Sequence, residues 1–166
     1  MEVYCFAARK DSMLKKFLMY AALVFGGICL IGSAFMGLIS LALGIVLLVV
    51  GSITYIRRDV EFEVSYFDGE IRMAKVFHKS SRKNLPTIQM EDVEVIAPPK
   101  DAKISYFEND SSVKVEDYTS KQPNVKYYEI AVNAGGVKKL YKVEVDDEFL
   151  NSVRKKYFSK VVSYRY

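Results

Sequence analysis

The feature that most constrains this chain is a run of forty residues, Phe17 to Ile56, without one Asp, Glu, Lys, Arg or His. Such a run is typical of a segment surrounded by lipid rather than water. A single helix of this length would extend roughly 60 Å, about twice the hydrocarbon thickness of a bilayer, whereas two helices of about 20 residues match it. The run therefore predicts a transmembrane hairpin over residues 13–56, with helices at about 14–35 and 37–56, rather than one long tilted or interfacial segment.

Basic residues flank the run on both sides. Four of them lie between Arg9 and Lys16, and Arg57 and Arg58 follow the run directly. Because positively charged flanks stay in the cytoplasm, we expect a multi-pass protein of the cell membrane with both termini cytoplasmic. A cleaved signal peptide would have an apolar core of about 7 to 15 residues before its cleavage site, whereas this run continues.

Small residues recur at helical spacing in both halves of the hairpin. Small side chains let helix backbones approach in lipid, where packing rather than hydrophobicity holds helices together. We expect the two small-residue stripes to face each other, and the alternative is that they line a path or bind a second protein. The stripe residues are Ala22, Gly26, Cys29 and Ser33 in the first helix and Gly37, Ser40, Gly44, Gly51 and Thr54 in the second.

After Arg58 the periodicity changes from helical to alternating, which is typical of half-buried strands. The residue pair Asp68-Gly69 predicts a tight hairpin between strands at residues 60–66 and 70–78. An acidic start and a basic end predict a closing helix at 146–158. Further short strands are expected at residues 85–90, 93–96, 104–107, 113–118, 126–133 and 137–145.

These elements predict one cytoplasmic β domain at residues 57–158. Residues 1–12 form a cytoplasmic N-terminal segment, either an edge strand of that domain or a loosely ordered end lying on the membrane. Residues 159–166 are expected to be a tail, either disordered or lying at the membrane interface.

The predicted first hairpin brings two basic segments to the same level. Residues 79–83 are expected to form a loop that returns to the height of the arginines after the membrane run. The alternative is an ordinary solvated turn. The predicted membrane-surface cluster is Arg57, Arg58, Lys79, Arg82 and Lys83.

Composition argues against several classes of function. After Ile56 there are 20 basic and 18 acidic residues, a balance too even for nucleic-acid binding. Cys5 and Cys29 imply no disulfide framework. The single histidine, His78, and the absence of glycine-rich phosphate loops or a nucleophile elbow argue against an enzyme, and we expect no cofactor.

Two further features each have two interpretations. The acidic residues 146–148 can cap the closing helix or hold a divalent cation, and capping explains all three. Aromatic residues on the predicted strands can cover a wet sheet face or form a protein-binding patch. These are Tyr106, Phe107, Tyr118, Tyr127, Tyr128 and Tyr141.

The order of elements resembles the pleckstrin-homology-like (PH-like) fold, in which several antiparallel strands are followed by one amphipathic C-terminal helix. The matching stretches are Phe62–Val76, Leu85–Ile96 with Glu91-Asp92-Val93-Glu94-Val95 at its centre, and Val137–Phe158. Two membrane helices before such a domain look like the bacterial membrane-anchored PH-like families, small proteins of uncharacterised function. Many eukaryotic PH domains bind inositol phosphates near the first hairpin turn, but here that turn is short and acidic, so that role is not carried over.

The expected fold class is an α+β membrane protein, a two-helix hairpin with a mainly antiparallel PH-like domain and one C-terminal helix. The expected function is a non-catalytic module that binds protein partners or lipid headgroups at the inner leaflet, alone or as a homo-oligomer. The alternative is an accessory subunit of a transport or secretion complex that associates through its glycine-lined helices. A third hypothesis, an enzyme acting on lipid or peptidoglycan precursors, would need a polar cluster at the interface near Arg57.

Overall fold

The computed structural model describes residues 3–9, 11–56, 58–77 and 81–164. The chain divides into two compact units, each considered by itself. One unit is residues 10–60, which contain the helical hairpin, and the other combines residues 1–9 with residues 61–166.

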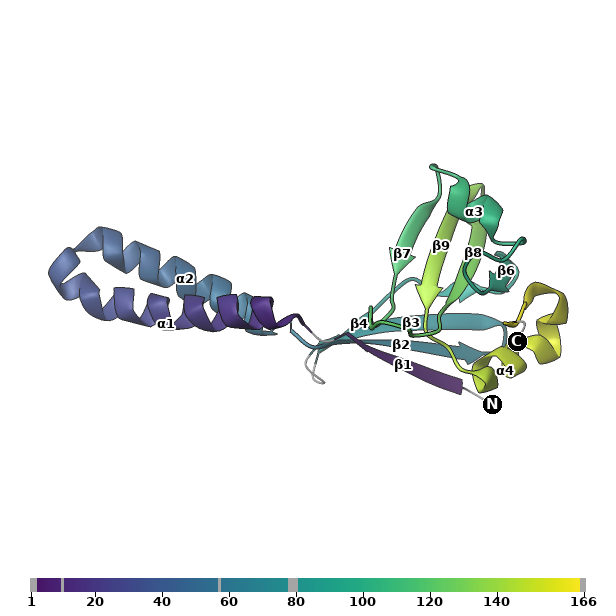
Figure 1. Ribbon diagram of the computed structural model, residues 1–166, viewed down its shortest axis with the longest axis horizontal. Coiled ribbons are helices and arrows are strands. Elements are labelled where there is room, and N and C mark those ends of the chain that lie inside the picture. Colours follow the sequence, from purple (N-terminus) through teal and green to yellow (C-terminus); the bar gives the residue numbers. More distant parts are fainter. Residues whose placement is uncertain (1–2, 10, 57, 78–80, 165–166) are drawn as a thin grey trace. The chain divides into compact units, whose positions relative to one another are not determined.

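The hairpin unit consists of α1 (Met13–Met36) and α2 (Leu38–Ile56), shown in Figure 1. Ser12 caps α1 by accepting a hydrogen bond from the backbone N–H of Lys15. Gly37 separates the helices with φ at +76°, a conformation that glycine adopts without strain. Both helices are long and apolar enough to cross a membrane, and only 11% of each apolar window is buried, unlike the core helix of a soluble protein.

The second unit contains two sheets, visible in Figure 1. The first has the strand order β1-β2-β3-β4, with β5 also paired to β3, and the second has the order β6-β8-β9-β7. The strands are β1 (Val3–Arg9), β2 (Val60–Phe67), β3 (Glu70–Phe77), β4 (Ser81–Asn84), β5 (Ile88–Gln89), β6 (Val93–Ala97), β7 (Lys114–Asp117), β8 (Tyr128–Ala134) and β9 (Val137–Val143). The N-terminal segment therefore contributes an edge strand, so the hairpin is inserted between two neighbouring strands of one sheet.

Two tight turns form where glycine follows Asp or Ala. Asp68 and Gly69 join β2 to β3 with φ at 45° and 88°. Gly135 and Gly136 join β8 to β9, which pair from Tyr128 with Val143 to Ala134 with Val137. Positive φ at both central residues suits the right-handed twist of the adjoining strands.

The partner of β3 is interrupted by a bulge. Ala74 pairs with Asn84 and Ile71 pairs with Ile88, so residues 85–87 oppose residues 72–73 with one residue in excess. Pro86 lies in this bulge, where its missing N–H removes no ladder hydrogen bond. The sequence-based prediction of a loop over residues 79–83 is wrong for residues 81–83, which belong to β4 (Ser81–Asn84).

The closing helix α4 (Asp147–Tyr157) packs against the core of the sheet unit. Asp146 caps it by accepting from the backbone N–H of Phe149 at 2.8 Å. Phe149 and Leu150 enter the same buried cluster as Val3 and Cys5 of β1. The core is therefore built from residues on both sides of the membrane run in sequence.

Residues after α4 continue to pack on the sheet unit. A short 3-10 helix (Phe158–Lys160) is followed by a parallel bridge between Val161 and Ile96. The Lys160 ammonium donates to the Met90 carbonyl at 2.6 Å. The expectation of a separate tail after residue 158 is wrong for residues 159–164, whereas 165 and 166 lie outside the described residues.

Two other local predictions differ from the structure. Residues 105–109 form the short helix α3 (Ser105–Asn109) rather than a strand, because Ile104 and Phe107 are both buried at a spacing of three. The strand β7 pairs with β9 in parallel, so the sheet is mainly but not wholly antiparallel. The predicted fold class, a two-helix hairpin with a mainly antiparallel domain and a C-terminal helix, is confirmed.

Candidate functional site

The predicted basic cluster divides between the two units. Arg82 and Lys83 lie on β4, where all four residues are exposed. Arg57 and Lys79 fall outside the described residues, as does His78. Convergence of the five basic side chains at one surface therefore stays a prediction.

Arg58 occupies a defined place within the hairpin unit. Its guanidinium lies 4.0 Å from the ring centre of Tyr55 on α2 and donates to the Tyr20 hydroxyl of α1 at 3.3 Å. It also lies 3.6 Å from the Asp59 carboxylate. Aromatic and arginine side chains of this kind concentrate where a membrane meets water. Arg58 thus links α1 to α2 at their open end.

The glycines of the hairpin pack helix against helix. A Cβ on Gly44 would lie 3.0 Å from the carbonyl oxygen of Gly26 and 3.0 Å from the backbone nitrogen of Leu30. A Cβ on Gly51 would lie 2.7 Å from the Leu23 side chain. At Gly44 the close atoms belong to the α1 backbone, so a side chain there would push the two helices apart, whereas at Gly51 the Leu23 side chain would have to move.

The other stripe residues are placed less uniformly. The Ser40 hydroxyl of α2 donates to the Cys29 carbonyl of α1 at 2.8 Å. The Ser33 hydroxyl donates within its own helix, to Leu30 at 2.7 Å. Thr54 likewise bonds Val50 of its own helix. Gly37 lies in the connection, and Ala22 faces a groove between the helices.

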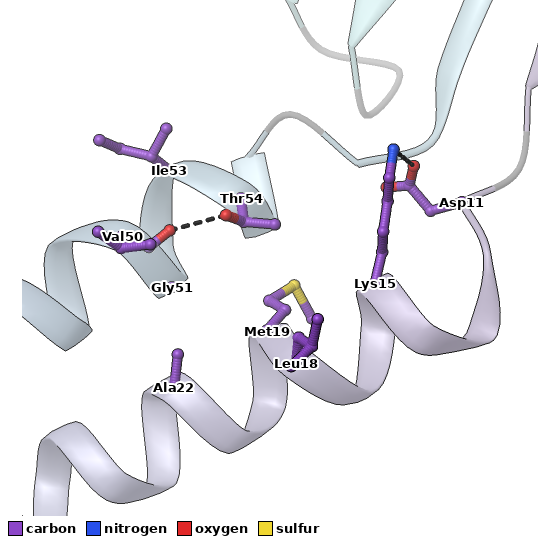
Figure 2. Close-up of a pocket in the computed structure, with 9 residues that line it drawn as sticks. All are labelled: Asp11, Lys15, Leu18, Met19, Ala22, Val50, Gly51, Ile53 and Thr54. Carbon is purple, nitrogen blue, oxygen red and sulfur yellow. Dashed lines mark hydrogen bonds and ion pairs between the residues drawn. The ribbon is translucent and has the colours of Figure 1, made fainter.

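This hairpin groove has a volume of about 470 Å³. Asp11 and Lys15 lie at one end of it (Figure 2), and apolar side chains together with Thr54 line the rest. The Lys15 ammonium is 3.6 Å from the Asp11 carboxylate. A surface of this kind suits a hydrocarbon chain or another apolar helix. Its lining is Asp11, Lys15, Leu18, Met19, Ala22, Val50, Gly51, Ile53 and Thr54.

A second pocket, of about 330 Å³, lies beside the bulge in the first sheet. Its polar lining residues are Arg72 on β3, Arg82 and Asn84 on β4, and Thr87 in the bulge. Met73 and Leu85 supply its apolar lining. We call it the bulge pocket. No single stretch of the sequence indicates this pocket, because its residues come together only through the pairing of β3 with β4 and through the bulge.

The strand tyrosines do not form an exposed patch. Tyr128 and Tyr141 are buried, and Tyr118 stacks on Tyr141 at 6.2 Å between ring centres. Burial, together with a hydrogen bond from its hydroxyl to Glu116, raises the pKa of Tyr118. Tyr106, on α3, is 63% exposed. Most of these rings therefore stabilise the domain rather than present a docking surface.

The acidic residues before α4 act as helix-start residues. Asp146 is the N-cap, while Asp147 and Glu148 lie in the first turn, where they complement the helix dipole. Among residues 3–9, 11–56, 58–77 and 81–164, no three His, Cys, Asp or Glu side chains gather to hold a metal ion.

Sequence reasoning missed a buried acid. Glu129 on β8 is fully buried, and its carboxylate lies 3.2 Å from the Lys142 ammonium of β9. Burial raises its pKa, opposed by Lys142 and reinforced by the neighbouring Glu108 of α3. The signal in the sequence was an acid directly before the apolar residues 130–132 of this strand.

Comparison with protein families agrees with this architecture. Residues 1–163 match the family model described as Bacterial PH-like domain (DUF6106). The chain belongs to this family. The DUF6106 match includes β1 and the helical hairpin, so the inserted hairpin is part of the family's pattern. No curated protein and no solved structure matches the chain.

Proposed function

We propose that this DUF6106 protein is a non-catalytic membrane-anchored module whose PH-like domain binds anionic lipid headgroups at the inner leaflet. The observation that carries the proposal is the pairing of β1 with β2, the strands that flank the hairpin. Because these strands are neighbours in one sheet, the chain must leave and re-enter the domain on the same side of any membrane it crosses.

The linkers support a location close to the membrane. Residues 10–12 separate β1 from α1, and residues 57–59 separate α2 from β2. Three extended residues span at most about 11 Å. Flanking arginines and lysines favour the cytoplasmic side.

Exposed basic side chains on the domain supply the attraction. Arg82 and Lys83 lie on the edge strand β4, and Lys79 precedes them in sequence. Each basic residue near an anionic surface contributes about 1 kcal/mol, a factor of about five in partitioning. Together they favour a negatively charged leaflet over a neutral one.

The test is vesicle co-sedimentation of the domain without its hairpin. Because β1 belongs to the sheet, residues 10–59 are replaced by a short Gly-Ser turn rather than removed together with β1. We expect binding that rises with phosphatidylglycerol content, falls with salt and weakens strongly when Lys79, Arg82 and Lys83 become Ser. The matched control replaces Lys114, Lys121 and Lys155 with Ser.

Equal loss in both triple variants would show that net charge alone drives the binding and would contradict a specific role for residues 79–83. No binding to any vesicle would overturn the headgroup proposal and direct the search to protein partners. The alternative, an accessory subunit in a transport or secretion complex, would need helix faces other than those of Gly26, Gly44 and Gly51. Those faces already pack within the hairpin.

A further inference from the structure

The bulge pocket lies on the outer face of the first sheet. On β3, Ile71 and Met73 belong to the buried core cluster, so Arg72 and Ala74 project from the opposite face. Asn84 pairs with Ala74 and therefore shares that outer face. Arg82, two residues before Asn84, projects from it as well.

The bulge makes room for a ligand at this point. The extra residue among 85–87 interrupts the partner of β3 between β4 and β5, so the regular ladder is broken opposite Arg72 and Met73. Natural bulges concentrate beside functional sites because they redirect side chains. The volume of about 330 Å³ is at the lower end of the range for small-molecule sites and suits a compact polar group.

Two acids hold the arginines in place. Glu70 accepts from Nε and Nη2 of Arg72, at 3.0 and 2.8 Å. Glu63 accepts from Nη2 of Arg82 at 3.1 Å and is only 8% exposed. A nearly buried carboxylate restricts the Arg82 side chain, so less conformational entropy is lost when a ligand is bound.

Two further polar residues line the pocket. The side chains of Asn84 and Thr87 make no hydrogen bond within the described ranges of the chain. They add an amide N–H₂ and a hydroxyl to the guanidinium donors. Planar, multiply donating guanidinium groups match the oxygens of phosphate closely.

We propose that the bulge pocket binds a phosphoryl group, with Arg72 and Arg82 as its cationic contacts and Thr87 and Asn84 as neutral donors. This site rests on the proposed function in one respect: the phosphoryl group would come from a lipid headgroup of the membrane. A soluble phosphorylated compound offers the same chemistry.

The experiment uses the full chain in maltoside micelles, which contain no phosphate, and measures binding of inorganic phosphate by titration calorimetry. We expect the dissociation constant to rise at least tenfold in Arg82→Gln and at least threefold in Thr87→Val. The matched control is Lys155→Gln, which also removes one positive charge but lies on the exposed side of α4, outside the pocket lining. Its dissociation constant should change less than twofold.

An equal loss in Lys155→Gln, or no phosphate binding by the unaltered chain, would overturn the proposed pocket. Arg82→Gln leaves Glu63 without its cation, so its melting temperature is measured alongside. Thr87→Val disturbs no ion pair and decides the case if the arginine variant does not fold.

A second arm adds phosphatidic acid to the micelles. Weaker apparent binding of inorganic phosphate identifies the lipid headgroup as the competing ligand, whereas unchanged binding identifies a soluble phosphoryl compound. The two proposals fail separately. If the domain binds vesicles, also as Thr87→Val, but the unaltered chain does not bind phosphate, only the pocket proposal is contradicted. If the chain binds phosphate but the domain does not bind vesicles, only the membrane role is contradicted.

Discussion

Arg9, the last residue of β1, donates from Nε to the carbonyl oxygen of Thr119 at 2.9 Å and thereby joins the chain before the hairpin to the loop after β7. Its Nη2 donates to the carbonyl and the carboxylate of Asp117, each at 3.1 Å. The guanidinium also lies 4.9 Å from the ring centre of Phe62. One side chain therefore connects both sheets.

Replacing Arg9 with Gln is expected to lower the free energy of unfolding of the sheet domain by about 1 to 3 kcal/mol, because charge-assisted bonds are lost. Near-UV circular dichroism melting of the full chain measures this. Lys121→Gln is the control, since Lys121 is exposed and 3.6 Å from the same carboxylate. Equal effects of both variants would contradict a special role for Arg9.

Arg9→Gln should also change the acid response. Burial acts to raise the pKa of Asp117, but hydrogen bonds from Thr119 and the charge of Arg9 outweigh it and hold the pKa below its ordinary value. Because the pKa is lowered, ionised Asp117 stabilises the fold at pH values above its unfolded-state pKa of about 4. This stabilisation is lost as the pH falls through the pKa of the folded state. Arg9→Gln should therefore lose less stability than the unaltered chain below about pH 4.

Gly44→Ala tests the packing of the hairpin. The added methyl would lie 3.0 Å from backbone atoms of α1, which cannot move aside like a flexible side chain. We expect a loss of about 1 to 3 kcal/mol in hairpin stability in detergent. Gly27→Ala is the control, because nothing lies within 4 Å of its Cβ position. A Gly44→Ala variant as stable as Gly27→Ala would refute close contact at this point.

Glu129→Gln tests the buried acid. Burial raises its pKa in the folded state, so folding favours the protonated form. Stability from this group is full below the unfolded-state pKa of about 4.3 and declines as pH rises through the folded value. The substitution should flatten that decline and raise stability near pH 7 by about 1 kcal/mol. Lower stability at pH 7 would show instead that the ion pair with Lys142 outweighs burial.

Cys5 supplies a probe for β1. The thiol is 6% exposed, and burial, aided by the neighbouring Asp146 charge, raises its pKa to about 11. At pH 8 about one thiol in a thousand is then the reactive thiolate. In a Cys29→Ala background, maleimide should label Cys5 only after denaturant opens the sheet. Rapid labelling of the native chain would mean that β1 is not seated in the core.

The local parts of the fold were predictable from sequence, and the long-range parts were not. The charge-free run, the Asp68-Gly69 turn and the acidic start of α4 are short-range signals that correspond directly to elements. Helix α3 was missed because its segment is too short to show a helical periodicity. Only two buried residues, Ile104 and Phe107, are three positions apart there.

The bulge pocket depends on register, which no single strand reveals. Arg72 and Arg82 are ten residues apart in sequence, and the extra residue in the opposing chain determines that both line one space. In the same way, nothing local in residues 3–9 shows that their partner strand begins at Val60.

The insertion of the hairpin between β1 and β2 has a consequence for biogenesis. The ribosome releases β1 first, and this strand stays without its partner β2 until about fifty further residues, including both helices, have been made. If the two helices cross a bilayer, only a hairpin that returns to its starting side delivers β2 to β1. Until then the chain carries an apolar, unpaired first strand, which is a site for non-native strand pairing.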